Sequence, residues 1–267
     1  MEVQKQSPKS LRVLCFHGFR TSAAIFEKQI RRWDPSILEL LDLTFIDGPF
    51  PASGKSDVEA IFPGPYFEWF QFNKDYSKFT NLEECKEFIT NYMQEHGPYD
   101  GLMGFSQGGV LAAAFAGLQQ KGLALQHHPS LRFIVLVSGT GFNNKELMHE
   151  CYSELVDCPS VHIIGDQDHL KTVNEELVQK FKDPQLIRHH GKHTVPRLGE
   201  DQTKLLKEFL LRIQTSSPSA IDGVVRNDGD AKMSISPNAT VDGFPNGDGA
   251  KEAFGSCLEN SKEAVKA

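Results

Sequence analysis

The stretch from Tyr99 to Ala116 limits the possible fold of this chain more than any other part of its sequence. It contains a short apolar segment over residues 101–105, a serine flanked by glycines, and an alanine-rich segment that begins at Gln107. This succession predicts a buried strand, an abrupt turn at Ser106 and a helix. Glycines two residues before and after the serine let the neighbouring backbone pack closely around a strained turn. We therefore expect Ser106 at the edge of a sheet, with a helix N-terminus beneath its hydroxyl.

Residues 104–108, Gly-Phe-Ser-Gln-Gly, fit the G-x-S-x-G pattern of the nucleophile elbow in α/β-hydrolases. Because glycine and serine each make up about 7% of residues, about one chain in ten of this length carries such a match by chance. The same turn in an ordinary α/β protein could cradle a phosphate. A catalytic role for Ser106 therefore depends on an acid and a base that follow it along the chain, in the order Ser-Asp-His.

Further apolar segments predict five more strands, at residues 11–16, 41–46, 131–137, 160–164 and 185–188. Helical periodicity and capping residues predict helices at residues 22–32, 81–96, 145–155, 173–182 and 199–214. Strands that alternate with helices indicate a parallel sheet with helices on both faces. Right-handed crossovers then predict an α/β-hydrolase fold of about six parallel strands in the order 2-1-3-4-5-6. Ser106 is expected at the carboxyl edge of the third strand.

Residues 10–214 are predicted to form one domain, because 39% hydrophobic residues in a chain of 267 suffice for a substantial core. Residues 1–9 are polar and are expected to be a disordered N-terminus. Residues 215–267 are rich in Ser, Gly, Asp, Asn and Lys and contain no periodic apolar stretch. A disordered C-terminal tail is therefore expected there.

Charge and cysteine content restrict the partners and the compartment. The net charge of -7 disfavours sequence-independent binding to nucleic acid and docking on anionic membranes. The five cysteines are scattered and form no C-x-x-C pair, which is typical of reduced thiols. The first residues lack the apolar region of a signal peptide, and no apolar run approaches the roughly 20 residues of a membrane span. The cytoplasm is the expected location, with the nucleus as the alternative, and no feature indicates an oligomeric state.

An acid is expected after the fifth predicted strand. Residues 165–168 are Gly-Asp-Gln-Asp, and either aspartate could supply the carboxylate. Asp168 is preferred, because a side chain four residues into the turn reaches back over the sheet edge more easily than Asp166. A helix-capping turn is the structural alternative for both aspartates. The neighbouring His169 is expected at the surface.

A base is expected after the last predicted strand, where His189, His190 and His193 follow one another closely. His193 is preferred because Gly191 can turn the chain toward Ser106, whereas the other two histidines lie against the strand end. In this role the imidazole takes the serine proton and returns it to the leaving group, while the carboxylate orients the ring.

Two backbone N–H groups are expected to bind the oxyanion of the reaction. One belongs to Gln107, directly after the serine. The other belongs to Phe19, in the loop after the first predicted strand, with Arg20 as the alternative. His17 in the same loop is expected to fix the turn geometry rather than to react.

An aromatic-rich segment separates the second predicted strand from the next helix. Residues 50–80 show no clear periodicity but contain many Phe, Tyr and Trp residues, and a loop of this length in a compact domain is usually functional or disordered. The segment begins at the sheet edge that also carries the serine, so its rings are expected to form an apolar substrate pocket. The predicted lining residues are Tyr66, Phe67, Trp69 and Phe70. Packing of these rings in the core is the alternative.

No cofactor and no metal are predicted. Residues 48–56 resemble a phosphate-binding loop, but they have five residues between the glycines where the Walker A pattern needs four, and two prolines remove N–H donors. Gly139-Thr-Gly141 lacks the third glycine of a dinucleotide fingerprint. The ten histidines and five cysteines show no zinc-binding spacing.

Taken together, the motifs resemble the FSH/OVCA2 family of small serine hydrolases. In chain order they are His17-Gly-Phe-Arg20, Asp47-Gly-Pro49, Gly104-Phe-Ser-Gln-Gly-Gly109, Ser138-Gly139, Gly165-Asp-Gln-Asp168 and His193-Thr-Val-Pro-Arg197. Pro65-Tyr-Phe-Glu-Trp69 is similar to the plant and fungal branches of that family. The resemblance covers residues 10–214.

This resemblance implies that Ser106, Asp168 and His193 are the catalytic residues of a carboxylesterase that needs no cofactor. The expected partner is a small-molecule ester, which would form an acyl-enzyme that water hydrolyses. A thioesterase or peptidase with the same triad is one alternative. A ligand-binding receptor of the same fold with vestigial turnover is another.

Overall fold

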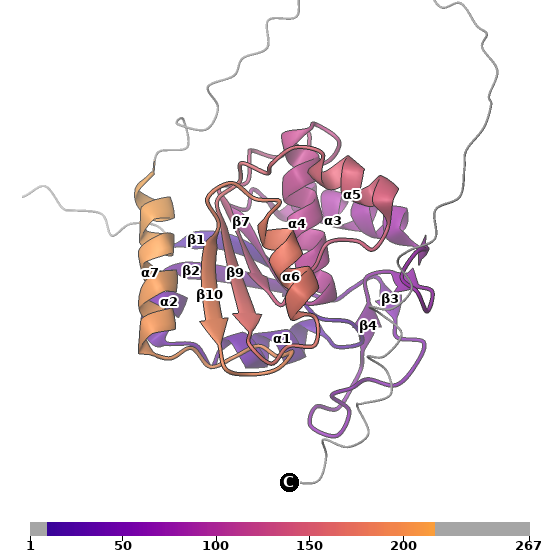
Figure 1. Ribbon diagram of the computed structural model, residues 1–267, viewed down its shortest axis with the longest axis horizontal. Coiled ribbons are helices and arrows are strands. Elements are labelled where there is room, and N and C mark those ends of the chain that lie inside the picture. The colour runs from indigo at the N-terminus through magenta and orange to yellow at the C-terminus, as the bar shows by residue number, and fades with distance from the viewer. Residues whose placement is uncertain (1–9, 217–267) are drawn as a thin grey trace, which may run out of the picture. The chain divides into compact units, whose positions relative to one another are not determined.

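The computed structural model describes residues 10–216, and its centre is a parallel six-stranded sheet (Figure 1). The strands are β1 (Leu11–Phe16), β2 (Leu41–Ile46), β7 (Gly101–Phe105), β8 (Phe133–Val137), β9 (Ser160–Gly165) and β10 (Gln185–His189). Their order in the sheet is β10-β9-β8-β7-β1-β2, and all five neighbouring pairs are parallel. The predicted fold class and strand order are therefore confirmed. The predicted N-terminal tail at 1–9 and residues 217–267 of the predicted C-terminal tail (215–267) lie outside the described residues, while Thr215 is the last residue of the final helix.

Seven helices flank this sheet in the described part of the chain. They are α1 (Ala23–Ile30), α2 (Pro35–Leu38), α3 (Leu82–His96), α4 (Gln107–Gln120), α5 (Lys145–Tyr152), α6 (Lys171–Val178) and α7 (Glu200–Thr215). As predicted, Ser22 caps α1 by accepting a hydrogen bond from the Ile25 N–H. The sequence analysis missed only α2, because one turn is too short to show a helical period. It begins at Pro35 after the Asp34 cap, a common helix start.

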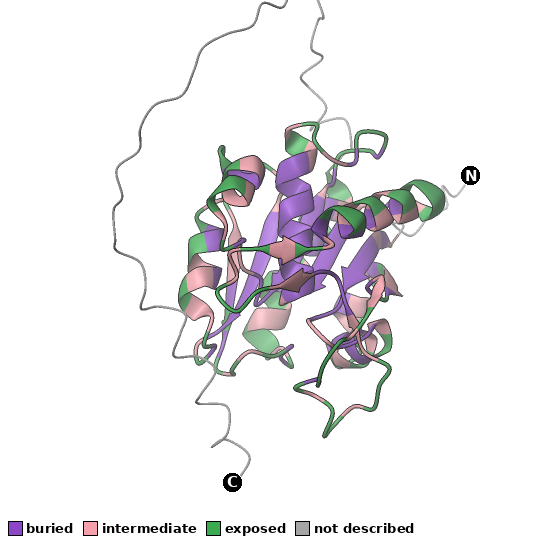
Figure 2. Cartoon of the chain, turned by 90° about the vertical axis from the view of Figure 1, so that its right-hand side faces the viewer, coloured by how far each residue is buried: buried purple, intermediate pink, exposed green. Residues whose placement is uncertain are grey.

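Two hydrophobic cores lie on the two faces of the sheet, because successive strand residues point to opposite sides. In β1, Leu14 and Phe16 pack with α3, α4, α5 and α6. Val13 and Cys15 pack with α1, α2 and α7 on the other face. Figure 2 shows α4 buried over most of its length, as expected of a helix that is apolar on all sides.

The aromatic-rich segment 50–80 contains two small antiparallel pairs instead of an irregular loop. Strand β3 (Phe50–Pro51) pairs with β4 (Phe67–Glu68), and β5 (Gln71–Phe72) pairs with β6 (Phe79–Thr80). The segment is also joined to the loop after β1, because the Phe67 N–H donates a 2.7 Å hydrogen bond to the Thr21 carbonyl. Strands of two residues leave no period-2 pattern that the sequence could reveal.

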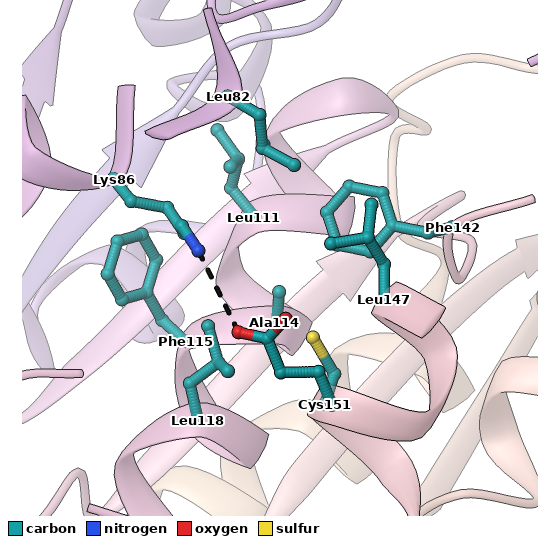
Figure 3. A pocket seen from close by; sticks show the side chains of 10 residues that line it. Leu82, Lys86, Leu111, Ala114, Phe115, Leu118, Phe142, Leu147 and Cys151 are labelled. Carbon is teal, nitrogen blue, oxygen red and sulfur yellow. Dashed lines mark ion pairs between the residues drawn. The ribbon is translucent and has the colours of Figure 1, made fainter. Parts of the chain in front are cut away.

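A small apolar cavity lies between α3, α4 and α5 (Figure 3). Its lining includes Leu82, Leu111 and Phe142, and the ion pair between Lys86 and Glu150 lies beside it at 3.9 Å. The cavity volume is about 10 Å³, which is room for about one water molecule. It is therefore too small to hold an acyl chain.

The described residues include four of the five cysteines, Cys15, Cys85, Cys151 and Cys158, and all four are free thiols. None of the helices described between residues 10 and 216 combines the length and the apolar character required to cross a bilayer.

Candidate active site

Ser106 occupies the abrupt turn between β7 and α4. Its backbone has φ 52° and ψ -115°, a conformation that a residue with a side chain adopts only when its surroundings enforce it. The surrounding packing requires glycine. A Cβ on Gly104 would collide with the Gly108 carbonyl, and a Cβ on Gly108 would collide with the Phe16 carbonyl. The glycines at these two motif positions let β7, α4 and β1 approach closely enough to hold the strained serine.

The structure brings together the three side chains that the sequence analysis preferred. His193 Nε2 lies 2.9 Å from Ser106 Oγ, and His193 Nδ1 lies 2.9 Å from Asp168 Oδ2 and 3.1 Å from Oδ1. An imidazole whose Nδ1 faces a carboxylate carries its proton on Nδ1. His193 Nε2 is then free to accept the hydroxyl proton of Ser106.

Asp168 is fixed in a buried position by its own surroundings. Its side chain is fully buried, the Leu170 N–H donates to Oδ1 at 2.8 Å, and Asn174 Nδ2 donates to Oδ2 at 3.2 Å. Burial favours the neutral carboxyl group. The hydrogen bond and charge of His193 and the Leu170 N–H outweigh this effect and lower the pKa of Asp168 to about 2. Asp168 is therefore ionised at neutral pH and can steady a protonated His193.

The alternative acid, Asp166, and the alternative bases, His189 and His190, form no hydrogen bond with Ser106. Asp166 forms surface ion pairs with Lys171 at 3.8 Å and with Arg188 at 3.6 Å. The His190 side chain is 99% exposed and lies 3.7 Å from Asp166. His189 is buried at the end of β10, where its Nδ1 accepts the Gly191 N–H. Among the residues considered for these two roles, only Asp168 and His193 form a chain of hydrogen bonds with the serine.

The two backbone groups expected to bind an oxyanion lie on the elements that flank the serine. Gln107 is the first residue of α4, where helix N–H groups lack intrahelical acceptors. Phe19 lies in the loop after β1, and within residues 10–216 its N–H has no hydrogen-bond acceptor. A Cβ on Gly18 would collide with the Phe105 ring, whose centroid lies 5.2 Å from that of the His193 ring. The loop therefore packs directly beside the serine turn.

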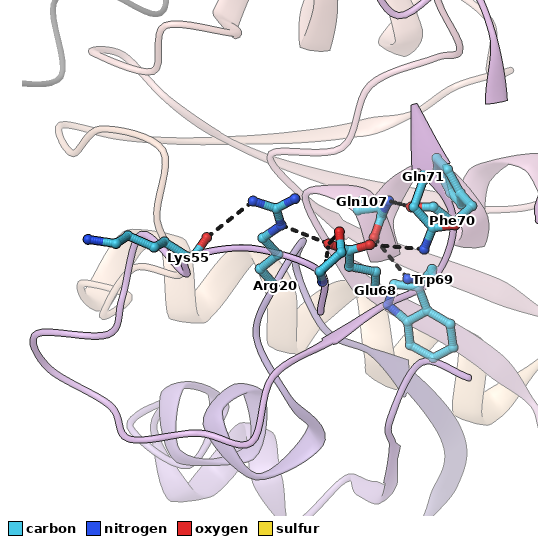
Figure 4. Close-up of polar contacts among 8 residues, drawn as sticks. Arg20, Lys55, Glu68, Trp69, Phe70, Gln71 and Gln107 are labelled. Carbon is cyan, nitrogen blue, oxygen red and sulfur yellow. Dashed lines mark hydrogen bonds and ion pairs between the residues drawn. The ribbon is translucent and has the colours of Figure 1, made fainter. Parts of the chain in front are cut away.

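The side chain of Gln107 forms a connection that the sequence analysis did not foresee. Its Oε1 accepts the Trp69 N–H at 3.1 Å, and its Nε2 donates to the Phe70 carbonyl at 2.8 Å (Figure 4). The amide is buried. Gln107, the residue directly after Ser106, thus connects the serine turn to the backbone of the aromatic segment. No pattern in the sequence indicates which backbone groups a buried amide will find.

A second unforeseen connection joins Arg20 to Glu68. The Arg20 Nε donates to Glu68 Oε1 at 2.7 Å, while Gln71 Nε2 donates to Oε2 at 2.9 Å (Figure 4). The Glu68 side chain is fully buried, whereas that of Arg20 is 28% exposed. Arg20 has φ 52°, so this ion pair also holds a strained residue of the loop that carries Phe19. Its side chain serves the loop structure, and its backbone N–H stays the alternative to the Phe19 N–H as an oxyanion donor.

His17 has the structural position expected of it. It is fully buried, its Nδ1 lies 2.7 Å from the Gly18 carbonyl, and its Nε2 accepts the Gly48 N–H at 2.9 Å. Burial is the main reason that the pKa of His17 is lowered to about 4. The neutral ring therefore connects the loops after β1 and β2.

The four aromatic residues predicted to line a pocket differ in their burial. The expectation is corrected for the two buried residues, Trp69 and Phe70. Trp69 is fully buried and Phe70 nearly so, both within the core on the α4 side of the sheet. The Trp69 Nε1 donates to the His17 carbonyl at 2.9 Å, so the ring is a packing residue anchored by its polar atom. Tyr66 and Phe67 are only partly buried, and their contact with substrate remains a prediction.

A parallel sheet whose third strand leads into a strained serine turn defines the α/β-hydrolase class. Within that class, the chain belongs to the serine hydrolase (FSH1) family, whose model matches residues 5–205. The family resemblance inferred from the motifs is confirmed, and the chain is a hydrolase.

The chain is also similar to curated proteins and to solved structures. The chain is 29% identical to esterase OVCA2 of Xenopus tropicalis over 223 residues, which cover 77% of this chain and 94% of that protein. It is 30% identical over 228 residues to a Schizosaccharomyces pombe protein named dihydrofolate reductase, and the match covers 79% of this chain but only 49% of that protein. The crystal structure of Zea mays acyl-protein thioesterase 2 superposes with a TM-score of 0.56 at 13% identity, covering 79% of this chain and 97% of that one. At that identity the superposition shows the fold alone.

Proposed function

We propose that this protein is a serine carboxylesterase that hydrolyses carboxylic esters through an acyl-enzyme on Ser106. The observation that carries the proposal is the unbroken hydrogen-bond chain from Ser106 Oγ through His193 to Asp168, with 2.9 Å at each of its two closest contacts. A serine hydroxyl is a weak nucleophile until a neighbouring base removes its proton. In the proposed mechanism His193 is that base, and Asp168 orients it.

In the first half of the proposed reaction, Ser106 Oγ attacks the ester carbonyl carbon while its proton moves to His193 Nε2. The imidazolium that forms is stabilised by the ionised, buried Asp168. His193 then gives the same proton to the alcohol oxygen, the carbon–oxygen bond breaks, and the alcohol leaves. The acyl group remains on the serine as an ester.

In the second half, water takes the place of the alcohol. His193 removes a proton from the water as it attacks the acyl carbon, and returns it to Ser106 Oγ as the acid leaves. Each tetrahedral intermediate carries a negative oxygen, for which the N–H groups of Gln107 and Phe19 are the proposed donors. Removing one such donor typically costs about 10²–10³ in turnover. Because every step moves a proton or an acyl group, the scheme requires no cofactor.

We propose a small-molecule ester as the substrate, with partly exposed aromatic residues next to the Phe19 loop as its apolar surroundings. Phe19 itself packs against Phe72 at a ring separation of 4.8 Å, and Phe72 stacks on Tyr76 at 4.7 Å. The free thiols of the described residues support a reducing compartment, and the cytoplasm is the proposed location.

Hydrolysis of p-nitrophenyl esters by the wild type and by Ser106→Ala tests this proposal. The wild type should turn over the esters, and the variant should retain the folded circular-dichroism spectrum while losing turnover. Full activity in Ser106→Ala would refute the mechanism. A parallel assay with acyl thioesters and peptide amides ranks the thioesterase and peptidase alternatives. A folded wild type that binds esters without hydrolysing any of these substrates would instead identify a binding protein.

A further inference from the structure

A second histidine lies next to the pair formed by His193 and Asp168. His169 Nδ1 is 3.7 Å from Asp168 Oδ1, and the His169 and His193 ring centroids are 5.1 Å apart at an interplanar angle of 61°. Potential metal-ligand atoms of these three residues all lie within 4.8 Å of one another. Two imidazoles and one carboxylate therefore lie close together at the edge of the site.

We propose that Asp168, His169 and His193 form a binding site for a divalent transition-metal ion, best matched by Zn²⁺, and that its occupancy inhibits the hydrolase. Zinc binds imidazole nitrogen and carboxylate oxygen at about 2.0–2.2 Å in tetrahedral geometry, so neighbouring ligand atoms lie about 3.3–3.5 Å apart. The two separations from Asp168 Oδ1 in the structure are 3.1 Å to His193 Nδ1 and 3.7 Å to His169 Nδ1. They lie on either side of the tetrahedral spacing.

One fixed ligand and one exposed, adjustable ligand suit a site that fills reversibly. Asp168 is held by the Leu170 N–H and by Asn174 Nδ2, which act as the outer-shell partners that orient a metal ligand. The His169 side chain is 54% exposed, so it can rotate to shorten the remaining ligand separation without disturbing the core. The same exposure leaves a fourth coordination position open to water.

Inhibition follows from the proton position on His193. A metal ion bound at Nδ1 takes the lone-pair position that the Nδ1 proton otherwise occupies, and the ring's single proton then sits on Nε2 after exchange with solvent. Nε2 faces Ser106 Oγ at 2.9 Å, and in this tautomer it donates a hydrogen bond instead of accepting the serine proton. The metal-bound site therefore keeps its geometry but lacks a general base. This inhibition rests on the proposed esterase function, whereas the binding of the metal does not.

A second histidine–aspartate pair in the chain has the same spacing and serves as a control. His190 Nδ1 lies 3.7 Å from Asp166 Oδ2, the same separation as between His169 and Asp168. Asp166 is instead paired with Lys171 and Arg188, whose positive charges repel a cation. His190→Ala is therefore a control that removes an equally spaced histidine without touching the proposed metal site.

The test measures zinc affinity and esterase inhibition on the metal-free full chain. Affinity is obtained by competition with a chromophoric chelator. The wild type and Ser106→Ala should bind zinc equally, although the second has no turnover. Loss of an outer-shell partner already weakens metal binding by about 10–100-fold, so His169→Ala should weaken zinc affinity and inhibition by at least about tenfold. Inhibition is expressed relative to each variant's own zinc-free turnover, and His190→Ala should match the wild type in zinc affinity and inhibition.

Equal zinc affinity in the wild type and His169→Ala would overturn the site. Wild-type turnover that persists when zinc binding is saturated would overturn the inhibition. The metal site and the esterase function can be refuted independently of one another. If the metal-free wild type hydrolyses no ester while zinc affinity still depends on His169, the esterase function is wrong and the metal site stands.

Discussion

Replacing Gln107 with methionine tests whether the serine turn and the aromatic segment act as one unit. Methionine keeps an unbranched side chain of similar length but makes neither hydrogen bond. The Trp69 N–H and the Phe70 carbonyl, which Gln107 binds at 3.1 and 2.8 Å, would remain buried without partners. Each such group costs about 1–3 kcal/mol, and burial of the thioether offsets part of this. We therefore expect the free energy of unfolding to fall by about 2–4 kcal/mol.

The assay combines urea denaturation with ester hydrolysis. Because the backbone N–H of Gln107 is unchanged, Gln107→Met should keep measurable turnover. Its kcat/KM should fall, because the backbone of residues 69 and 70 is no longer fixed to the serine turn by the Gln107 side chain. Gln119→Met is the matched control on the same helix. Gln119 accepts the Leu131 N–H at 2.8 Å and donates to the Pro129 carbonyl at 3.1 Å, so its loss should lower stability while leaving kcat/KM unchanged.

Two results would refute this reasoning. A stability loss below about 1 kcal/mol in Gln107→Met would mean that water satisfies the two backbone groups. An equal loss of kcat/KM in both variants would mean that helix stability, rather than the connection to the aromatic segment, controls activity.

Three further predictions concern other parts of the site. Asp168→Asn should lower kcat by about 10⁴, because it favours the wrong tautomer of the base. Asp166→Asn should leave kcat nearly unchanged. The reverse ranking in steady-state assays would transfer the acid's role to Asp166. Trp69→Ala should reduce the free energy of unfolding by about 3–5 kcal/mol in urea titrations, and a loss typical of a surface residue would contradict its place in the core. Acidification from pH 7 to pH 4 should destabilise the fold, because His17 has a pKa of about 4 in the folded protein against 6.5 as its ordinary value. The unfolded chain binds the proton first, so His17 alone accounts for a loss of about 3 kcal/mol of the stability present above pH 6.5. The buried His162, with a pKa of about 3, adds to this loss. Stability that stays constant from pH 7 to 4 would contradict the buried, neutral imidazole.

The arrangement of strands could be predicted from the sequence because it depends on local signals and general rules. Apolar segments separated by helical ones indicate a parallel sheet, and crossover handedness then restricts the order of its strands. The carboxyl ends of parallel strands share one edge, so Ser106, Asp168 and His193 were expected to meet there. The structure has them in hydrogen-bonding contact. Their catalytic roles remain predictions.

The side-chain connections could not be predicted, because they depend on contacts between residues distant in sequence. Nothing near Gln107 indicates that its amide binds the backbone 37 and 38 residues earlier. Glu68 and Arg20 are likewise 48 residues apart. Aromatic content alone also cannot distinguish a pocket wall from a core, which is why the sequence predicts Trp69 and Phe70 in a pocket although both are buried. His169 and His193 are well separated in sequence, which hid their convergence around Asp168.

The most direct test of the central claim is to locate the covalent adduct that a fluorophosphonate forms with the protein. We predict one adduct per chain by intact-mass measurement, mapped by peptide sequencing to Ser106. The adduct should be absent in Ser106→Ala and form far more slowly in His193→Ala. It should also form more slowly in the presence of a competing ester. A folded wild-type protein that forms no adduct, or forms it at another residue, would contradict the assignment of Ser106 as the activated nucleophile.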